Sequence, residues 1–455
     1  MGGRAVRRLL ALTVATLFLV LGQVSTAFGH TGNESYVYLD IYDNTVEGRV
    51  EFPINDLNEV LGTDFPTNAD RALEAAEAER ELLHEYTGEH LELREQEGGE
   101  WPIVMGDIET LGANGGYIIV NFAVDKEFAS VPRTFTVAYD GIMHAKPERN
   151  GLLLIGTDWG SGTFNNEAEE LLRFTPEAPA QEVDLGGTSF WKGFTGVVVL
   201  GAEHIEIGSD HILFILALVL PSVLVFSRLV GWQPSASFGA SLWRVLKIVT
   251  MFTIAHTITL TLGGLGIIEF PPVLVETVIA VSIILAALHN ILPIFVNKEW
   301  IIAFVFGLFH GFGFAGLLSD LGLTQSRQFV SLLGFNVGIE LGQAAIILMV
   351  FPALFIARRT RAYRPGMYAA SVLLIVVAAA WVLDRALGID LGISWWVDAV
   401  LLWPRSILLV AALYAVAIAL YFVDKRRGAL LPVVADPEAA DRAPEETAVA
   451  EEARP

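Results

Sequence analysis

The pattern of hydrophobic and polar positions changes sharply along the chain. Up to about residue 190 the apolar residues come in short runs, whereas from about Val197 onward they form runs of roughly 18 to 25 residues. A helix of that length crosses the ~30 Å hydrocarbon core of a bilayer at about 1.5 Å per residue. The pattern therefore predicts an α-helical polytopic membrane bundle of about seven transmembrane helices, preceded by a β-rich, sandwich-like extracytoplasmic domain.

Alternating apolar and polar positions in the first part indicate strands. Tyr36–Tyr42 and Val46–Phe52 are expected to pair as a hairpin across Asp43 and Asn44. Further strands are expected at Tyr117–Val124, Thr134–Tyr139 and Leu152–Ile155.

One amphipathic helix is expected among these strands, from Asn68 to about His90, because this stretch is rich in Ala, Glu and Leu. Thr67 or Asn68 would cap it. His84 and His90 are expected on its exposed surface.

Seven hydrophobic spans are expected in the bundle. An apolar stretch from Phe194 to Ile205 and a break at Gly208 precede the first span, whose helix Ser209 would cap. The spans are expected at about Ser209–Phe226, Leu242–Leu262, Val273–Leu292, Trp300–Leu318, Phe329–Ile356, Met367–Leu387 and Leu401–Val423.

Lys and Arg are concentrated in every second loop of the bundle. They follow the first, third, fifth and seventh spans, at Arg228, Arg244, Lys247, Lys298, Arg358, Arg359, Arg361, Arg364 and Lys425–Arg427. Cytoplasmic loops carry such an excess. The expected protein is thus a multi-pass protein of the cell membrane, with the ectodomain outside and the C-terminus in the cytoplasm.

The two ends of the chain resemble segments outside the folded core. Arg4, Arg7 and Arg8 precede an apolar stretch and then small residues, as in an export signal. The last residues are rich in Pro, Ala and Glu and lack aromatics. The expected organisation is a signal peptide at 1–29, the extracytoplasmic domain at 30–190, the transmembrane domain at 191–428 and a disordered cytoplasmic tail at 429–455.

Composition supports this division and narrows the chemistry. Between His30 and Lys192, Asp and Glu outnumber Lys and Arg by roughly three to one, and the whole chain carries a net charge of -22. Such a surface repels nucleic acid, so no nucleic-acid partner is expected. The chain has no cysteine, which excludes disulfides, thiolate metal sites and a cysteine nucleophile.

Ionisable and amide side chains occur inside the expected spans. A charged side chain at the bilayer centre costs ~2.5–3.5 kcal/mol, so a group of them indicates pairing or function. The candidate metal ligands are His204, Asp210, His211, His256, His289, His310 and Glu340, with Asn290, Asn336 and Gln343 as supporting polar residues. Imidazole and carboxylate suit borderline divalent transition metal ions, and the same groups can relay protons.

The fifth span has two distinct faces. Asn336, Glu340 and Gln343 follow helical spacing on one side, and Gly334, Gly338 and Gly342 recur every four residues on nearly the opposite side. The glycines would let a neighbouring helix approach closely, leaving the polar face toward the bundle interior.

At these residues the chain resembles the HupE/UreJ family of hydrogenase and urease accessory membrane proteins. His204 followed after five residues by Asp210 and His211 carries the resemblance, which continues through His256-Thr257, His289-Asn290, Phe309-His310-Gly311 and Asn336 to Gln343. The resemblance implies uptake of a divalent transition metal ion, nickel or cobalt. The permeases of the family carry a histidine and a glutamate where this chain has Phe314 and Leu317, and the large N-terminal domain resembles a second branch of the family.

Three functions are compatible with these residues. The leading hypothesis is a permease in which Asp210, His204 and His211 meet the ion at the outer mouth, His256, His310 and Glu340 hold it at mid-depth, and His289 lies at the exit. The alternatives are an intramembrane metal-dependent hydrolase and a membrane-anchored assembly or sensor protein with an extracytoplasmic partner. A hydrolase would converge His204, His211 and His310 within about 5 Å of one point, and a permeation path would spread the ligands over more than about 10 Å.

His30 suggests one further metal-binding group. Cleavage after Gly29 would make His30 the mature N-terminus, where its α-amine and imidazole could chelate one ion.

Overall fold

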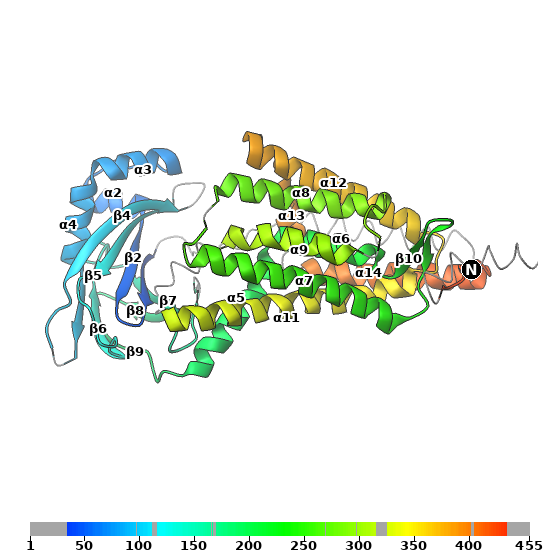
Figure 1. Ribbon diagram of the computed structural model, residues 1–455. Helices are drawn as coiled ribbons and strands as arrows, with labels where there is room; N and C mark the ends of the chain where they lie inside the picture. Colours follow the sequence, from blue (N-terminus) through cyan, green and yellow to red (C-terminus); the bar gives the residue numbers. More distant parts are fainter. Residues whose placement is uncertain are drawn as a thin grey trace, which may run out of the picture. The chain divides into compact units, whose positions relative to one another are not determined.

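The computed structural model describes residues 34–96, 98–111, 116–164, 166, 170–268, 270–296, 298–314, 325–401 and 405–434. They form two compact units, one built mainly of strands and one of helices (Figure 1). The unit of strands ends at Val197 but also includes residues 325–331 at the start of α11. The expected signal peptide and His30 lie outside the described residues, as do residues 435–455.

The N-terminal unit contains two sheets. A six-stranded sheet has the order β4 (Ile103–Leu111), β5 (Tyr117–Val124), β2 (Val46–Pro53), β1 (Ser35–Ile41), β7 (Gly151–Asp158) and β8 (Glu170–Phe174). Only β1 and β7 pair in parallel among the recorded strand pairs of this sheet. An antiparallel three-stranded sheet has the order β3 (Leu91–Glu95), β6 (Thr134–Tyr139) and β9 (Ala180–Asp184).

Both sheets contribute to one hydrophobic core, which confirms the β-rich domain and explains its sandwich-like pattern. Val37 and Leu39 of the large sheet and Phe135 and Val137 of the small one are fully buried in the same cluster. The hairpin of β1 and β2 forms in the expected register. The helical stretch is a pair, α3 (Ala69–Ala78) and α4 (Arg80–His90), with Asn68 as the cap of α3. A short helix, α2 (Ile54–Leu61), was not expected.

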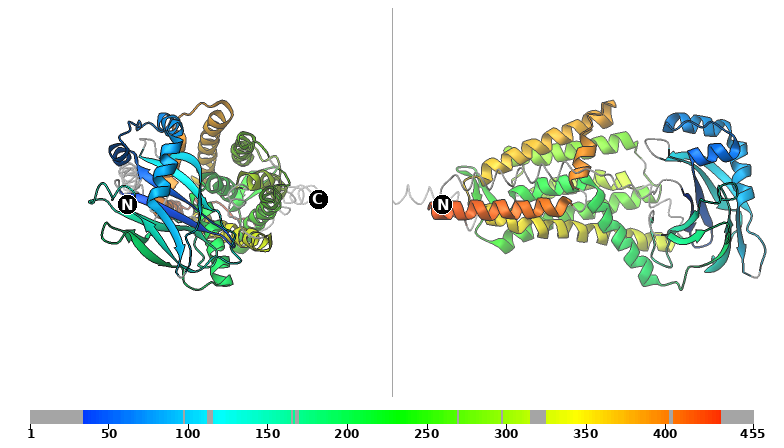
Figure 2. Two further views of the ribbon diagram at one scale, coloured as in Figure 1. Left: turned by 90° about the vertical axis from the view of Figure 1, so that its left-hand side faces the viewer. Right: turned by 180° about the vertical axis from the view of Figure 1, so that it is seen from behind.

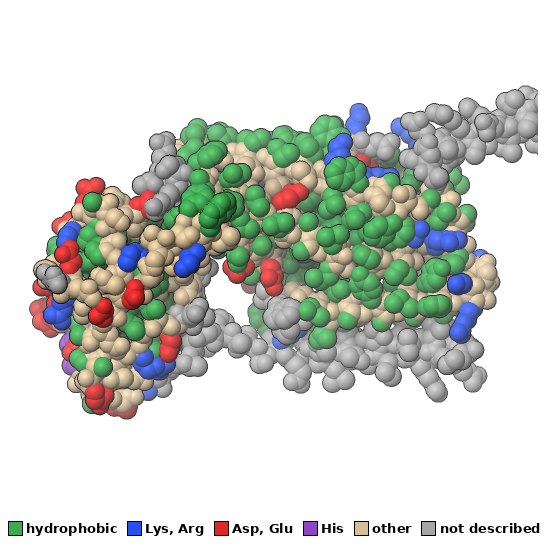
Figure 3. Space-filling model, turned by 90° about the horizontal axis from the view of Figure 1, so that it is seen from below, with side chains coloured by type: hydrophobic (Ala, Val, Ile, Leu, Met, Phe, Trp, Pro, Cys, Tyr) green, Lys and Arg blue, Asp and Glu red, His purple; other side chains and the backbone are tan. Residues whose placement is uncertain are grey.

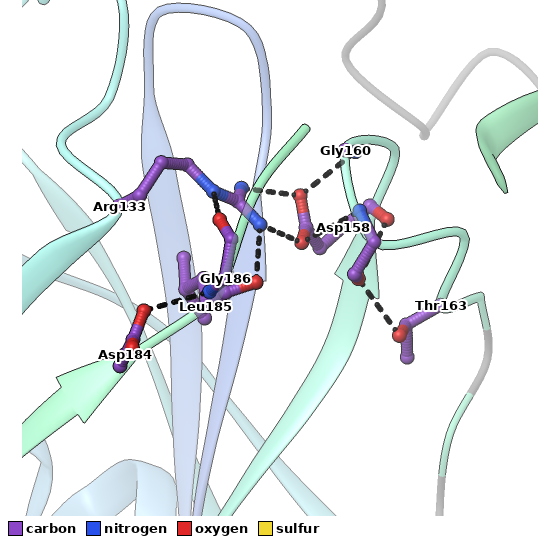
Figure 4. Close-up of polar contacts among 8 residues, drawn as sticks. Arg133, Asp158, Gly160, Thr163, Asp184, Leu185 and Gly186 are labelled. Carbon is purple, nitrogen blue, oxygen red and sulfur yellow. Dashed lines mark hydrogen bonds and ion pairs between the residues drawn. The ribbon is translucent and has the colours of Figure 1, made fainter. Parts of the chain in front are cut away.

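A buried ion pair joins the two sheets near the start of the first bundle helix (Figure 4). Arg133 donates to both carboxylate oxygens of Asp158 at 2.8 and 2.7 Å, and to the carbonyls of Leu185 and Gly186. Asp158 begins a loop whose Gly160 carbonyl accepts the Ser189 N–H. This contact anchors the segment that leads into α5.

The helical unit consists of long helices that lie side by side (Figure 2), with a bent pair, a hairpin and short helices among them. Its elements are α5 (Phe190–Ile207), α6 (Ser209–Ser222), β10 (Leu224–Ser227), β11 (Gly231–Pro234), α7 (Phe238–Gly264), α8 (Pro272–Ile291), α9 (Glu299–His310), the 3-10 helix η1 (Gly311–Phe314), α11 (Gln325–Ala357), α12 (Tyr363–Leu387), α13 (Ile393–Leu401) and α14 (Arg405–Arg426). The first residues of α5 fall in the N-terminal unit.

Seven spans were expected, but five helices among the described residues are individually long and apolar enough to cross a membrane, or six if the bent pair of α5 and α6 counts as one span. The expected fourth span is a shorter apolar helix, from Glu299 into η1. The first span ends at Ser222 instead of Phe226, because residues 224–227 pair with 231–234 as a hairpin. The cap of α6 is Gly208, and the expected capping role of Ser209 is wrong.

The basic loops of the bundle meet at one end. Arg244 donates to the Leu224 carbonyl, Arg358 to that of Ser235 and Arg359 to that of Leu431. On the face drawn in Figure 3, the helical region is mainly hydrophobic and its Lys and Arg side chains gather at one end. The alternation of basic loops along the sequence thus corresponds to a physical end of the bundle.

Close packing between α5 and α11 depends on glycine. A Cβ at Gly338 would overlap the Val198 carbonyl, and a Cβ at Gly201 would overlap the Phe335 carbonyl. Asn336 and Gln343 instead bond to α7. The two expected faces of α11 are therefore observed.

We predict that Gly338→Leu destabilises the bundle by at least about 1–3 kcal/mol, because the side chain has no space at the helix contact. Gly366→Leu is the matched control, since a Cβ at Gly366 meets no atom within 4 Å. Thermal unfolding in detergent measures the difference. Equal stability of the two variants would contradict the close approach of α5 and α11.

We predict that Asp158→Asn lowers the free energy of unfolding of the N-terminal domain by up to about 3–5 kcal/mol, because Arg133 loses its charged partner. Burial alone would raise the pKa of Asp158, but Arg133 and the loop hydrogen bonds lower it below its usual value. The stabilisation is therefore complete above the unfolded pKa of about 3.9 and is lost as pH falls through the lower folded value.

Hydrogen exchange of β7 and β9 in the intact chain tests this prediction. Glu170→Gln is the control, because its ion pair with Arg173 is largely exposed. Unchanged protection in Asp158→Asn, or no acid-dependent loss in the unmodified chain, would refute the role of the pair.

Candidate metal centre

A sharp bend between α5 and α6 builds the first half of the site. The two helices meet at 73° at Gly208. In a straight helix, His204 and His211 would lie on one face about 10.5 Å apart along the axis. The bend reduces the distance between their ring centroids to 4.8 Å.

Glycine is needed at the bend because three groups occupy the space around it. A Cβ on Gly208 would lie 2.7 Å from the His204 carbonyl oxygen, 2.9 Å from His211 Nδ1 and 3.3 Å from Asp210 Oδ1. The break expected from the sequence is thus the feature that assembles the motif.

Helices α7 and α9 supply two more histidines. His256 lies in the middle of α7 and His310 is the last residue of α9, and the two helices pack along each other. Gly311 contacts the α7 backbone so closely that a Cβ there would overlap the His256 carbonyl. This approach places His310 beside the other rings, with its centroid 5.3 Å from that of His211.

Three of the four imidazoles can bind one ion. His204, His211 and His256 each offer a ligand nitrogen, and these atoms all lie within 4.8 Å of one another. His211, His256 and His310 are at most 5% exposed. The Nε2 atoms of these three buried rings have no hydrogen-bond partner among the described residues.

The hydrogen bonds at Nδ1 explain why Nε2 is available. His211 Nδ1 lies 3.0 Å from Asp210 Oδ1, and His310 Nδ1 lies 3.0 Å from the Phe306 carbonyl. Both partners can only accept, so each ring carries its proton on Nδ1 and a lone pair on Nε2. His256 Nδ1 faces Asn336 Oδ1 at 3.4 Å, while the Asn336 amide donates to the Leu332 carbonyl. Metal-binding histidines are commonly oriented in this way.

Aromatic rings surround the histidines. His310 lies against Phe252 and Phe214 at centroid distances of 4.8 and 5.5 Å, and His204 lies 5.4 Å from Phe335. Apolar walls limit the water around the centre and strengthen its electrostatic interactions. The spacing in the sequence does not indicate these phenylalanines, because they come from three different helices.

Helix α11 supports the centre through amides more than through charge. Asn336 orients His256, and Gln343 bonds Thr253 one turn earlier on α7. The polar partner of Glu340 among the described residues is Thr250, six residues and about 9 Å along α7 from His256. Glu340 of α11 therefore contacts α7 away from His256 and does not reach the histidines.

Two sequence candidates lie away from the centre. His289 Nδ1 accepts the Phe295 N–H at 3.3 Å, and its Nε2 faces Glu299 at 3.9 Å. Asn290 donates to the Ala217 carbonyl and to Ser371, so it links α8 to α6 and α12. His289 borders a separate cavity of about 50 Å³ with Glu299 and Arg244.

The structure therefore describes a multi-pass membrane protein whose bent first span carries part of a buried histidine cluster. The sequence profile described as "HupE / UreJ protein" matches residues 180–385, so this region of the chain belongs to the HupE/UreJ family. The matched region includes α6 to α9 and the centre. No curated protein and no solved structure matched the chain.

We predict that Gly208→Ala disrupts the centre, because its Cβ would force the His204 carbonyl and the His211 ring apart. The affinity of this centre for metal should fall at least tenfold in the purified chain, while Gly239→Ala, at a position with open space, should leave it unchanged. Isothermal titration with Ni²⁺, Co²⁺ and Zn²⁺ measures both. Unchanged metal binding by Gly208→Ala would show that the bend at Gly208 is not needed for the metal centre.

Proposed function

We propose that the protein is a permease for a divalent transition metal ion, which binds within the bundle at His204, His211 and His256. The metal site rests on the convergence of three imidazoles whose ligand atoms lie within 4.8 Å of one another, and the assignment to transport rests on the family match. Nitrogen ligands without thiolates favour nickel, cobalt, zinc or copper over magnesium and calcium. The family is associated with nickel and cobalt uptake, which favours these two ions as cargo.

Helix ends contribute to cation binding in this proposal. The ion would lie where α5 ends and α6 begins, an arrangement found in transporters whose broken helices bind ions near the middle of the membrane. The carbonyl end of α5 favours a cation, and Asp210 in the first turn of α6 is favoured by the N-terminal end of that helix. His310, beside His211, is a fourth nitrogen available during transfer.

The direction of transport follows from the basic end of the bundle. Under the positive-inside rule this end is cytoplasmic, which places the N-terminal domain outside. The ion would thus enter from the side of the N-terminal domain. His204, His211 and His256 lie close together instead of being spread along a path, so transport in this proposal proceeds through alternating access to one site.

The compact cluster is the arrangement expected of the second candidate function, an intramembrane hydrolase, and it differs from the spread of ligands expected for a permeation path. Three histidines can hold zinc and leave one position open for water. In that case the ion would remain bound through many turnovers. A permease must release it across the membrane.

The test is metal uptake by proteoliposomes containing the purified chain. His211→Ala removes one of the three ligands, and Asp210→Asn removes the charge that orients His211, so both should reduce uptake at least tenfold at equal abundance. His84→Gln is the control, because it alters a histidine of α4 in the N-terminal domain and not one of the candidate ligands of the bundle. It should retain uptake.

Two outcomes would overturn the permease. Normal uptake by both His211→Ala and Asp210→Asn would show that the histidine centre takes no part in transport. Metal that binds to the unmodified chain at this centre, but neither crosses the membrane nor exchanges with labelled ion, would favour the hydrolase.

A further inference from the structure

A second group of histidines lies in the N-terminal domain, far along the sequence from the bundle. The register of β3 and β6 pairs Leu91 with Tyr139, so His90 and Asp140 face each other just beyond the paired strands. The Asp140 N–H donates to the His90 carbonyl at 3.2 Å. His90 Nδ1 lies 2.6 Å from Asp140 Oδ1.

The loop after β6 brings His144 next to His90. Its ring stacks on that of His90, with centroids 4.1 Å apart and an interplanar angle of 15°. His144 Nδ1 lies 3.2 Å from the Asp140 carbonyl oxygen. One aspartate therefore bonds both rings, through its carboxylate and its backbone.

The backbone of this loop is held in an unfavourable conformation. Ile142 has φ +61°, and it is the one non-glycine residue with positive φ among the described residues. A β-branched side chain rarely adopts this region, and such strain persists only where the surroundings enforce it. The Tyr86 hydroxyl accepts the Ile142 N–H at 2.9 Å, and Lys146 pairs with the buried Asp56 at 2.6 Å. These contacts hold the loop that carries His144 beside His90.

The hydrogen bonds assign the same tautomer to both rings. The carboxylate and the carbonyl of Asp140 can only accept, so both imidazoles donate from Nδ1. Each neutral ring then presents a lone pair on Nε2. A carboxylate that orients a histidine in this way is a common arrangement behind metal ligands.

We propose that His90 and His144 form a second metal site, which binds a borderline divalent transition metal ion through their two Nε2 atoms. Asp140 orients both rings, and water completes the coordination. His144 is exposed, while the side chains of His90 and Asp140 are 16% and 46% exposed, so the ion reaches the site from solvent. Because the lone pairs of two stacked rings point in parallel, binding requires the exposed His144 ring to rotate out of the stack until both Nε2 atoms lie about 2.0–2.1 Å from the ion. The site does not depend on transport by the bundle.

The experiment uses the full chain, purified without a polyhistidine tag and carrying His30→Ala, His211→Ala and His256→Ala. These changes remove the bundle centre and the expected N-terminal chelate. Zn²⁺ titration should show one bound ion, and bound Cu²⁺ should show nitrogen coupling from two imidazoles in its electron paramagnetic resonance spectrum. His90→Gln and His144→Gln should each weaken binding at least tenfold, and Asp140→Asn by about 10–100-fold.

His84→Gln is the matched control, since it alters another histidine of α4 and should leave binding unchanged. Because His144 is exposed, its replacement should not unfold the domain, so that weaker binding would report the loss of a ligand. Circular dichroism of each variant checks that it is folded. No bound ion in the starting chain would overturn the site. Undiminished affinity in either His90→Gln or His144→Gln would overturn the pairing of the two rings.

Discussion

The bend at Gly208 is the constraint on which the candidate centre depends. Helical spacing puts His204 and His211 on one face but two turns apart, too far to share an ion. The bend brings the rings to 4.8 Å between centroids, and the carbonyl and side-chain atoms around Gly208 leave no space for a Cβ. It also ends one helix and begins another at the same place, so that backbone groups released from helical bonding lie beside the histidines. A local break in the backbone thus produces both the geometry and part of the electrostatics.

Helix α11 preserves this arrangement, because one of its faces packs against α5 and another bonds to α7. Gly338 lets α11 approach α5 until the backbones are in contact, which supports the helix that carries His204. Two residues earlier, Asn336 on another face orients His256 of α7. A larger residue at the glycine position would separate α11 from α5, and the loss of the asparagine would free the His256 ring to rotate. The position and the tautomer of the ligands therefore depend on neighbouring residues of one helix.

The sequence predicted most of the long elements because their periodicity is strong. Five of the seven expected spans, the β1–β2 hairpin and the break at Gly208 were visible as patterns. Strands β3, β4, β8 and β9 were missed. Many side chains of β4, β8 and β9 are exposed or polar, which weakens the alternation, and β3 directly follows the end of α4. The candidate centre was only partly predictable. His204 and His211 come from one motif, but the inclusion of His256 and the separation of His289 depend on how α7, α8 and α9 pack, and that is a tertiary property.

The charge of the ligand set determines how tightly the proposed centre would hold an ion. In the proposed centre three neutral imidazoles surround a dication, and Asp210 is the carboxylate that bonds one of these rings. Glu340, which would have added a second negative charge, bonds Thr250 on α7 instead. Selectivity in such a site comes from ligand type and geometry, whereas additional anionic ligands would deepen binding and slow release. A permeating ion must be held strongly enough to replace its water and weakly enough to leave. For the proposed permease, a centre of nitrogens with one supporting carboxylate would therefore have to release its ion without the help of a second nearby charge.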